Sequence, residues 1–280
     1  MKHKRYLLKI CPSLVGKTVI VTGATGTIGR GIVECCLVLG ADVLMAVRNT
    51  AKAEALKEKL ARKHFDVTRV SIAELEASSP ESINKFVKSL PEKAGYYLIN
   101  NAGTLSGGKQ YMTNFLGPMY LSVRLSERME KIVFQSSLSY RWRKSRTDWS
   151  DVQSNKVRTN MKRYARSKRL LNTTAVALNN PKFCLVHPGI CSTNIIPTRL
   201  LQVLCRPIFH SARTAALPAV IALSKPVPQT HILAPRLFGI WGKPKLRRMQ
   251  KSLFKAEELG RAKANFENEL SKISDVNISR

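Results

Sequence analysis

Two side chains suited to moving a proton lie four residues apart, Tyr164 and Lys168 in the run YARSK. At that spacing both lie on one face of a helix. A phenol with a pKa of about 10 transfers protons poorly at neutral pH, and a neighbouring ammonium lowers that pKa by stabilising the phenolate. The pair therefore predicts an acid and base group, for example a proton donor to a carbonyl being reduced. Taken alone, this spacing is common by chance.

A second candidate site is the glycine-rich run TGATGTIG at residues 22–29, which follows a predicted strand and opens a predicted helix. Glycines permit a tight turn, and the helix N-terminus offers free N–H groups and partial positive charge to a pyrophosphate. In this context the run predicts a dinucleotide site, the alternative being an ordinary strand–turn–helix corner. The candidate cofactor-binding residues are Gly23, Thr25, Gly26, Thr27, Ile28 and Gly29.

The second predicted strand ends in Val47-Arg48-Asn49, at the place where dinucleotide folds contact the adenosine ribose. An acidic residue there would bind a 2′-hydroxyl, whereas the planar guanidinium of Arg48 suits a 2′-phosphate. Arg48 therefore favours NADP(H) over NAD(H). The alternative, in so basic a chain, is an ordinary surface arginine.

Strands and helices that alternate along the chain must position these residues. The predicted strands cover residues 17–21, 42–47, 68–72, 96–99, 131–135 and 182–186. The predicted helices cover 28–39, 50–63, 80–90, 114–129 and 164–178, followed by a helical, Pro-punctuated segment at 195–256 and a charged helix at 256–273. This alternation predicts an α/β fold with a doubly wound parallel sheet in three layers, the Rossmann fold. No linker or repeat interrupts it, so one domain, 1–280, is expected, with its C-terminal helix within 257–280.

In this order the motifs resemble the short-chain dehydrogenase/reductase family, from about Leu14 to Thr193. Further matches are Asn100-Asn101-Ala102-Gly103 after the fourth strand, Asn114 in TNFLG, Ser136-Ser137 after the fifth strand, and His187-Pro188-Gly189 with Thr193 after the sixth. Within the family the chain is most similar to the retinol dehydrogenase-like branch. That likeness rests on Ala46-Val47-Arg48 followed by Lys52-Ala53-Glu54, on the Ser-Ser-Leu-Ser block, and on a long Ser-to-Tyr interval with Asp148-Trp149.

The resemblance implies an oxidoreductase that interconverts an alcohol and its aldehyde or ketone by hydride transfer. Tyr164 would be the catalytic acid and base, and Lys168 would bind the nicotinamide ribose and lower the pKa of Tyr164. Ser137 would orient the substrate oxygen, with Ser136 as the competing assignment. Asn114 would hold a water that relays protons to Lys168. The remaining implied cofactor contacts are Asn101, Ala102, Gly103, Pro188, Gly189 and Thr193. A homodimer or homotetramer is also implied.

Three features depart from the family pattern. Thr27 stands where the classical middle glycine belongs, and only twelve residues separate Asn101 from Asn114. The interval from Ser137 to Tyr164 is strongly basic. These departures motivate an alternative hypothesis, a non-catalytic dinucleotide-binding sensor or scaffold with a basic, polyanion-binding surface.

The charge of the chain is strongly unbalanced. Its 280 residues hold 47 Lys and Arg against 18 Asp and Glu, a net charge of +29, and no acidic residue lies between Asp151 and Glu257. A field of this sign attracts phosphates, anionic lipids or nucleic acid. Basic runs are not interleaved with aromatics, so a nucleic acid partner is not expected. No apolar run reaches the roughly 18 residues of a membrane span, and no secretory signal is evident. A cytoplasmic protein, peripheral at a membrane at most, is expected.

The segment 195–256 is expected to cover the substrate. Its apolar residues are Ile195, Ile196, Leu200, Leu201, Val203, Leu204, Phe209, Leu237, Phe238, Ile240 and Trp241. An apolar lid suits a lipophilic alcohol or carbonyl. The interspersed Arg and Lys would also allow contact with an anionic membrane surface, and simple core packing is the alternative. The six cysteines show no C-x-x-C pair or zinc spacing, so reduced thiols and no metal site are expected.

Overall fold

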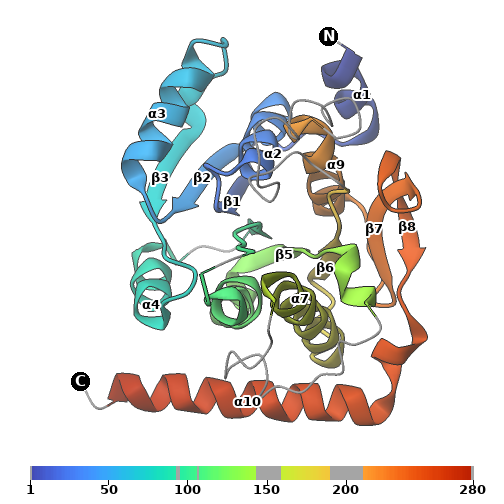
Figure 1. The fold of residues 1–280 in the computed structure, drawn as a ribbon. Coiled ribbons are helices and arrows are strands. Elements are labelled where there is room, and N and C mark those ends of the chain that lie inside the picture. The colour runs from blue at the N-terminus through green and yellow to red at the C-terminus, as the bar shows by residue number, and fades with distance from the viewer. Residues whose placement is uncertain (1, 93–94, 106, 143–158, 190–210, 279–280) are drawn as a thin grey trace.

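The computed structural model describes residues 2–92, 95–105, 107–142, 159–189 and 211–278. These residues form an eight-stranded sheet in the order β3-β2-β1-β4-β5-β6-β7-β8 (Figure 1). The strands are β1 Thr18–Thr22, β2 Asp42–Val47, β3 Val70–Glu74, β4 Tyr96–Asn100, β5 Met129–Gln135, β6 Phe183–Val186, β7 His231–Leu237 and β8 Trp241–Arg248. All neighbours pair in parallel except β7 and β8.

Helices cover both faces of this sheet, as expected for strands that are buried on both sides. The helices are α1 Lys2–Ile10, α2 Thr27–Val38, α3 Thr50–Ala61, α4 Pro80–Ser89, α5 Gly117–Leu125, α7 Asn160–Ala177, α9 Ala212–Ser224 and α10 Ala256–Ile278. Apolar residues of α1, α2, α3 and α9 form the core on one face, and those of α4, α5, α7 and α10 form the core on the other. The predicted doubly wound α/β fold is confirmed.

Local sequence signals explain where several helices begin. The Asn49 side chain accepts a hydrogen bond from the Lys52 N–H at 2.8 Å and caps α3. Ser79 caps α4, with Pro80 in the first turn. The predicted helix at 114–129 is divided: a π-helical turn, η2 (Met112–Leu116), precedes α5, and Pro118 lies in the first turn of α5 as predicted.

Over the described residues 211–255, the expectation that 195–256 is helical is confirmed for α9 and is wrong for 231–248. Only α9 is an α-helix there, because 231–248 forms the β7–β8 hairpin at the sheet edge. Residues 195–210 lie outside the described part of the chain. The edge strand β8 escapes detection because most of its residues are exposed and half of them are basic, so it lacks the alternation of a half-buried strand. Among the described helices, none is both long and apolar enough to cross a membrane.

Candidate active site

The predicted site residues gather at one edge of the sheet. Because β1, β4, β5 and β6 are parallel, their carboxyl ends meet at the same edge. The segments that follow them there are the glycine turn, residues 101–103, Ser136-Ser137 and residues 187–189. Ligands of open parallel sheets bind at this edge.

Helix α7 brings Tyr164 and Lys168 to the end of β5. The Ser137 side chain lies beside the Tyr164 phenol, where it lowers the pKa of that phenol. The Lys168 Nζ lies 5.8 Å from the centre of the Tyr164 ring and donates to the Gln135 carbonyl oxygen at 2.7 Å. Lys168 is only 4% exposed. The bond to Gln135 uses one of the three N–H donors of this ammonium, and the others can serve a ligand.

Burial governs the titration of both groups. Burial raises the pKa of Tyr164, and the neighbouring Ser137 side chain opposes this only in part. Burial lowers the pKa of Lys168 to about 8. The pKa of Tyr164 is therefore raised overall, because desolvation of the phenol is the largest effect on it. The expectation that Lys168 lowers this pKa stays a prediction.

The two adjacent serines have different surroundings. The Ser137 Oγ accepts hydrogen bonds from the Ser139 N–H at 3.3 Å and from the Ser139 hydroxyl at 3.0 Å. Its own proton is thus available to Tyr164 or to a substrate oxygen. The Ser136 Oγ is buried without a partner. The geometry brings Ser137 to Tyr164 and favours it over Ser136.

Asn114 is fully buried in η2. Its Oδ1 accepts from the Thr104 N–H at 2.8 Å, and its Nδ2 donates to the Thr104 carbonyl at 2.8 Å and to the Ser167 Oγ at 3.1 Å. A Cβ added at Gly103 would lie 3.2 Å from the Asn114 Oδ1 and 4.0 Å from the Lys168 Nζ. Asn114 and Lys168 therefore flank Gly103. The Asn114 amide is occupied in holding the loop, so a water relay would have to use the backbone carbonyl.

The glycine turn is closely packed. Gly23 has a φ of +62°, and a Cβ there would lie 2.8 Å from the Ala102 Cα. A Cβ on Gly29 would overlap the Gly23 carbonyl oxygen. The Asn101 Nδ2 donates to the carbonyls of Thr22 and Gly23 at 3.0 and 3.2 Å. Asn101 thus fixes the turn.

A dinucleotide fits this edge. Gly26 precedes α2 without a side-chain cap, and the first turn of α2 holds no acidic residue, so its N–H groups and positive end are available to a pyrophosphate.

Both amide atoms of Gln135 are also buried without a partner, beside Lys168. Buried polar atoms usually have partners. Sequence reasoning missed Gln135, although a glutamine directly before Ser136 in an otherwise apolar strand end was the available signal.

Arg48 lies at the end of β2 and is exposed. Its Nη1 pairs with the Glu76 carboxylate at 3.3 Å. Burial raises the pKa of Glu76, but hydrogen bonds from Ser78 and Arg48 outweigh this and lower it overall. An exposed ion pair of this kind contributes little stability, so a phosphate could replace the Glu76 carboxylate as the partner of Arg48.

The last predicted contacts follow β6. Pro188 and Gly189 are half-buried, and Gly189 has a φ of +82°. Thr193 lies outside the described residues. In the described part of the chain, no group of three or more His, Cys, Asp or Glu could hold a metal ion, and Cys11, Cys35, Cys36 and Cys184 are free and buried.

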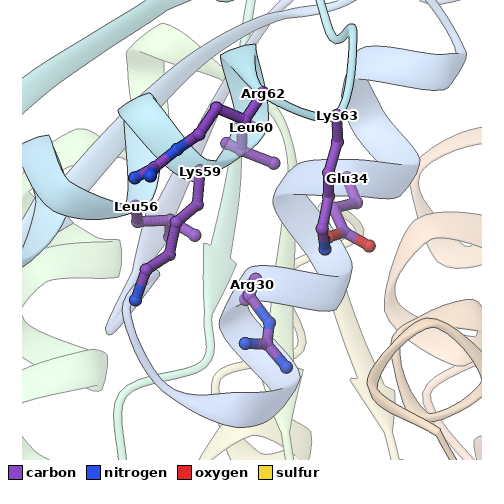
Figure 2. Close-up of a pocket in the computed structure, with 7 residues that line it drawn as sticks. All are labelled: Arg30, Glu34, Leu56, Lys59, Leu60, Arg62 and Lys63. Carbon is purple, nitrogen blue, oxygen red and sulfur yellow. The ribbon is translucent and has the colours of Figure 1, made fainter.

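A groove of about 350 Å³ lies between α2 and α3, apart from these residues (Figure 2). Glu34 is one of its lining residues, and its carboxylate accepts from the Arg213 Nε at 2.6 Å and from the Lys63 Nζ at 3.1 Å. Figure 2 shows Lys63 next to Glu34 at one side of the groove. These ion pairs join α2 to α9 and to the turn that follows α3. We therefore assign the charged residues of this groove a structural role. Its lining residues are Arg30, Glu34, Leu56, Lys59, Leu60, Arg62 and Lys63.

Comparisons with known proteins agree with this geometry. The short chain dehydrogenase family model matches residues 17–138. Retinol dehydrogenase 12 of Mus musculus is 30% identical over 229 residues, which cover 72% of this chain and 71% of that protein. Retinol dehydrogenase 14 of Mus musculus is 29% identical over 231 residues, 70% of this chain and 67% of that protein.

Solved structures share the fold. An uncharacterized protein from Mycobacterium paratuberculosis is 25% identical, with a TM-score of 0.74 over 94% of this chain and 96% of that one. A short chain dehydrogenase from Burkholderia cenocepacia, solved in complex with NADP, is 20% identical, with a TM-score of 0.57 over 76% and 92% of the two chains. From the glycine turn, the Ser137–Tyr164 contact and these relatives, we conclude that the chain belongs to the short-chain dehydrogenase/reductase family, near its retinol dehydrogenase branch, and is an oxidoreductase acting on CH–OH donors.

Proposed function

We propose that this protein interconverts a lipophilic alcohol and its aldehyde or ketone with NADP(H), and that Tyr164 is the acid and base. The observation that carries the proposal is the placement of the Ser137 side chain beside the Tyr164 phenol, with the buried Lys168 ammonium next to them at the carboxyl edge of the sheet. A scaffold or sensor would have no use for this arrangement.

Reduction of a carbonyl needs a hydride on carbon and a proton on oxygen. A bound NADPH would supply the hydride. The Ser137 Oγ is the acceptor in both of its bonds with Ser139, so its own proton is not used there. This hydroxyl would donate that proton in a hydrogen bond to the carbonyl oxygen. The Tyr164 O–H would then give its proton to that oxygen. The reverse oxidation would use the same groups in the opposite order.

Lys168 and Asn114 would support this proton transfer. The Lys168 ammonium would stabilise the phenolate that Tyr164 leaves behind, and its remaining N–H donors would bind the nicotinamide ribose. A water on the Asn114 backbone carbonyl would return a proton by way of Lys168. The neighbouring Gly103 leaves room between the two side chains, since it has no Cβ.

Arg48 supports the assignment of NADP(H). Its exposed guanidinium at the end of β2 can leave Glu76 for a 2′-phosphate, which offers a doubly charged partner. Solved proteins of this fold in complex with NADP or NADPH are consistent with that choice.

We also propose that 1–280 acts as one catalytic domain whose substrate cover is smaller than the segment 195–256. Helix α9 and strands β7 and β8 belong to the sheet and its covering layer. Of the described part of this segment, the turn of the β7–β8 hairpin reaches the site, because a Cβ on Gly239 would lie 2.7 Å from Leu138 Cδ1. Exposed Leu237 and Phe238 beside it suit a lipophilic substrate.

The test is a parallel fluorescence titration with NADPH and NADH, followed by turnover assays with lipophilic aldehydes and ketones. We expect tighter binding of NADPH and loss of its reduced nicotinamide absorbance on addition of an aldehyde. Equal affinity for the two cofactors would contradict the role of Arg48. NADPH binding without turnover of any tested carbonyl would favour the sensor hypothesis.

A further inference from the structure

The turn of the β7–β8 hairpin has an unusual composition. Phe238 and Gly239 both have positive φ, +51° and +75°. Hairpin turns of this kind prefer Asn, Asp or Gly, because a large side chain is disfavoured at positive φ. Phe238 is nevertheless present, and it is 79% exposed. Its exposure means that it adds little to the core, and the conformation of the turn does not explain why a phenylalanine stands there.

Exposed apolar side chains are concentrated on this hairpin. In the described part of the chain seven large apolar residues are exposed, and four of them are Leu237, Phe238, Trp241 and Leu246. Leu237 and Trp241 pair across the turn that holds Phe238, so three of the four gather at the turn, and exposed apolar side chains gathered in this way mark an interaction site. Edge protection explains lysine and proline on an edge strand, but it does not explain an exposed phenylalanine and tryptophan at the turn.

Basic side chains surround these apolar residues. Arg236, Lys243, Lys245 and Arg248 are exposed on the same hairpin, and the hairpin holds no acidic residue. The charge is therefore of one sign, with aromatic rings within it. This combination is complementary to an anionic lipid surface, where basic residues meet headgroups and aromatic rings enter the interface.

Helix α1 extends this surface. The Lys243 Nζ lies 5.2 Å from the centre of the Tyr6 ring, which joins the hairpin to α1. Figure 1 shows α1 and the β7–β8 hairpin on the same side of the molecule. Helix α1 buries Leu7 and exposes Leu8 among Lys4, Arg5 and Lys9. Helix α1 and the hairpin thus both expose apolar side chains among basic ones.

The same surface borders the candidate active site. Strand β7 is parallel to β6, so its carboxyl end lies at the edge where the site is built. There Gly239 lies against Leu138, which directly follows Ser137. We propose that the β7–β8 hairpin, together with α1, docks this protein on an anionic lipid bilayer, with Phe238 and its neighbours inserted into the interface. The docked enzyme would take its lipophilic substrate directly from the bilayer. That last step depends on the proposed function, whereas the docking does not.

The test is co-sedimentation with vesicles of phosphatidylcholine alone and of phosphatidylcholine mixed with phosphatidylserine, without substrate or cofactor. We expect binding to the mixed vesicles, weakened by salt, and little binding to phosphatidylcholine alone. Phe238→Asn keeps a residue suited to positive φ, so the turn is retained. It should reduce the partition coefficient about tenfold, as expected for withdrawing one large apolar side chain from the interface.

Charge variants provide the matched control. Lys243→Gln with Lys245→Gln should weaken binding to the mixed vesicles, whereas Lys85→Gln with Lys88→Gln on α4 should not. Equal binding by wild type, Phe238→Asn and Lys243→Gln/Lys245→Gln would overturn the proposal, as would binding that survives high salt on neutral vesicles. A single-stranded polynucleotide that binds as tightly as the mixed vesicles, with no effect of Phe238→Asn, would identify a general polyanion surface instead. Because none of these measurements uses turnover, their failure is separate from failure of the proposed function.

Discussion

Gly29→Ala tests the packing of the glycine turn against the sheet. An added Cβ would overlap the Gly23 carbonyl oxygen and would lie 2.8 Å from Ala24 Cα and 2.9 Å from Asn101 Nδ2. Two of these neighbours are backbone atoms and cannot rotate away. The Gly23 oxygen also accepts from the Gly26 N–H at 3.1 Å, so any displacement disturbs the turn itself.

Overpacking of this kind costs about 1–3 kcal/mol of stability. At about 2–4 °C per kcal/mol for a chain of this size, the Tm should fall by about 2–12 °C. NADPH affinity should fall as well, because the displaced carbonyl lies between the turn and the start of α2. The assay is thermal unfolding with and without NADPH, together with the fluorescence titration.

Gly26→Ala is the matched control. At Gly26 an added Cβ would meet only the Gly23 carbonyl oxygen, at 3.3 Å, and φ is −70°. This variant should keep a Tm within about 2 °C of the wild type, as expected for a change of a few tenths of a kcal/mol. A Gly29→Ala protein with the Tm and NADPH affinity of the wild type would refute the packing argument.

Three further predictions follow from individual contacts. Ser137→Ala should lower kcat by about 10²-fold or more, since it removes the group that orients the substrate oxygen, whereas Ser136→Ala should change kcat far less; equal losses, in steady-state kinetics, would reverse the assignment of the two serines. Glu34→Gln should destabilise the protein in urea unfolding at neutral pH, because it removes the charge that pairs with Arg213 and Lys63. The loss should be only about 1–2 kcal/mol, because the exposure of Arg213 and Lys63 screens these bonds in part. Burial raises the pKa of Glu34, but the hydrogen bonds from Arg213 and Lys63 outweigh burial and lower the folded-state pKa below 4.5. The stabilisation is therefore complete above pH 4.5 and fades as the pH falls through the folded-state pKa. This pH dependence should be absent from Glu34→Gln, and a variant with the pH profile of the wild type would contradict the prediction. Arg48→Gln should weaken NADPH binding by about tenfold and leave NADH binding unchanged, as for loss of one charged hydrogen bond; parallel losses would show that Arg48 does not face the 2′-phosphate.

The alternation of strands and helices made the core of this fold predictable. β-branched runs such as Thr18–Thr22 are buried in the sheet interior, so their sequence reports their position directly. The order of residues at the carboxyl edge follows from the parallel topology. The place of Ser137 at the end of the fifth strand could be predicted in this way, whereas its grouping with Tyr164 and Lys168 came from the resemblance to the short-chain dehydrogenase/reductase family.

Features that depend on tertiary surroundings could not be predicted in this way. Strand β8 is exposed and basic, so its type is decided by pairing with β7 and not by its own pattern. The raised pKa of Tyr164 arises from burial in the folded protein, which the residue's own sequence neighbourhood does not show. The Arg48–Glu76 pair joins the ends of β2 and β3, and sequence alone does not show that the guanidinium already has a partner.

The central claim is that Tyr164 transfers the proton, and Tyr164→Phe tests it most directly. The variant keeps the ring and removes only the hydroxyl, and Tyr120→Phe, in which the lost hydroxyl bonds Asn84 at 2.7 Å on a different part of the fold, is the matched control. The measurement is turnover of a lipophilic aldehyde with NADPH, alongside NADPH binding by fluorescence. We predict that Tyr164→Phe binds NADPH as the wild type does and loses turnover by about 10²-fold or more, while Tyr120→Phe keeps it. Turnover by Tyr164→Phe at the wild-type rate would contradict the account.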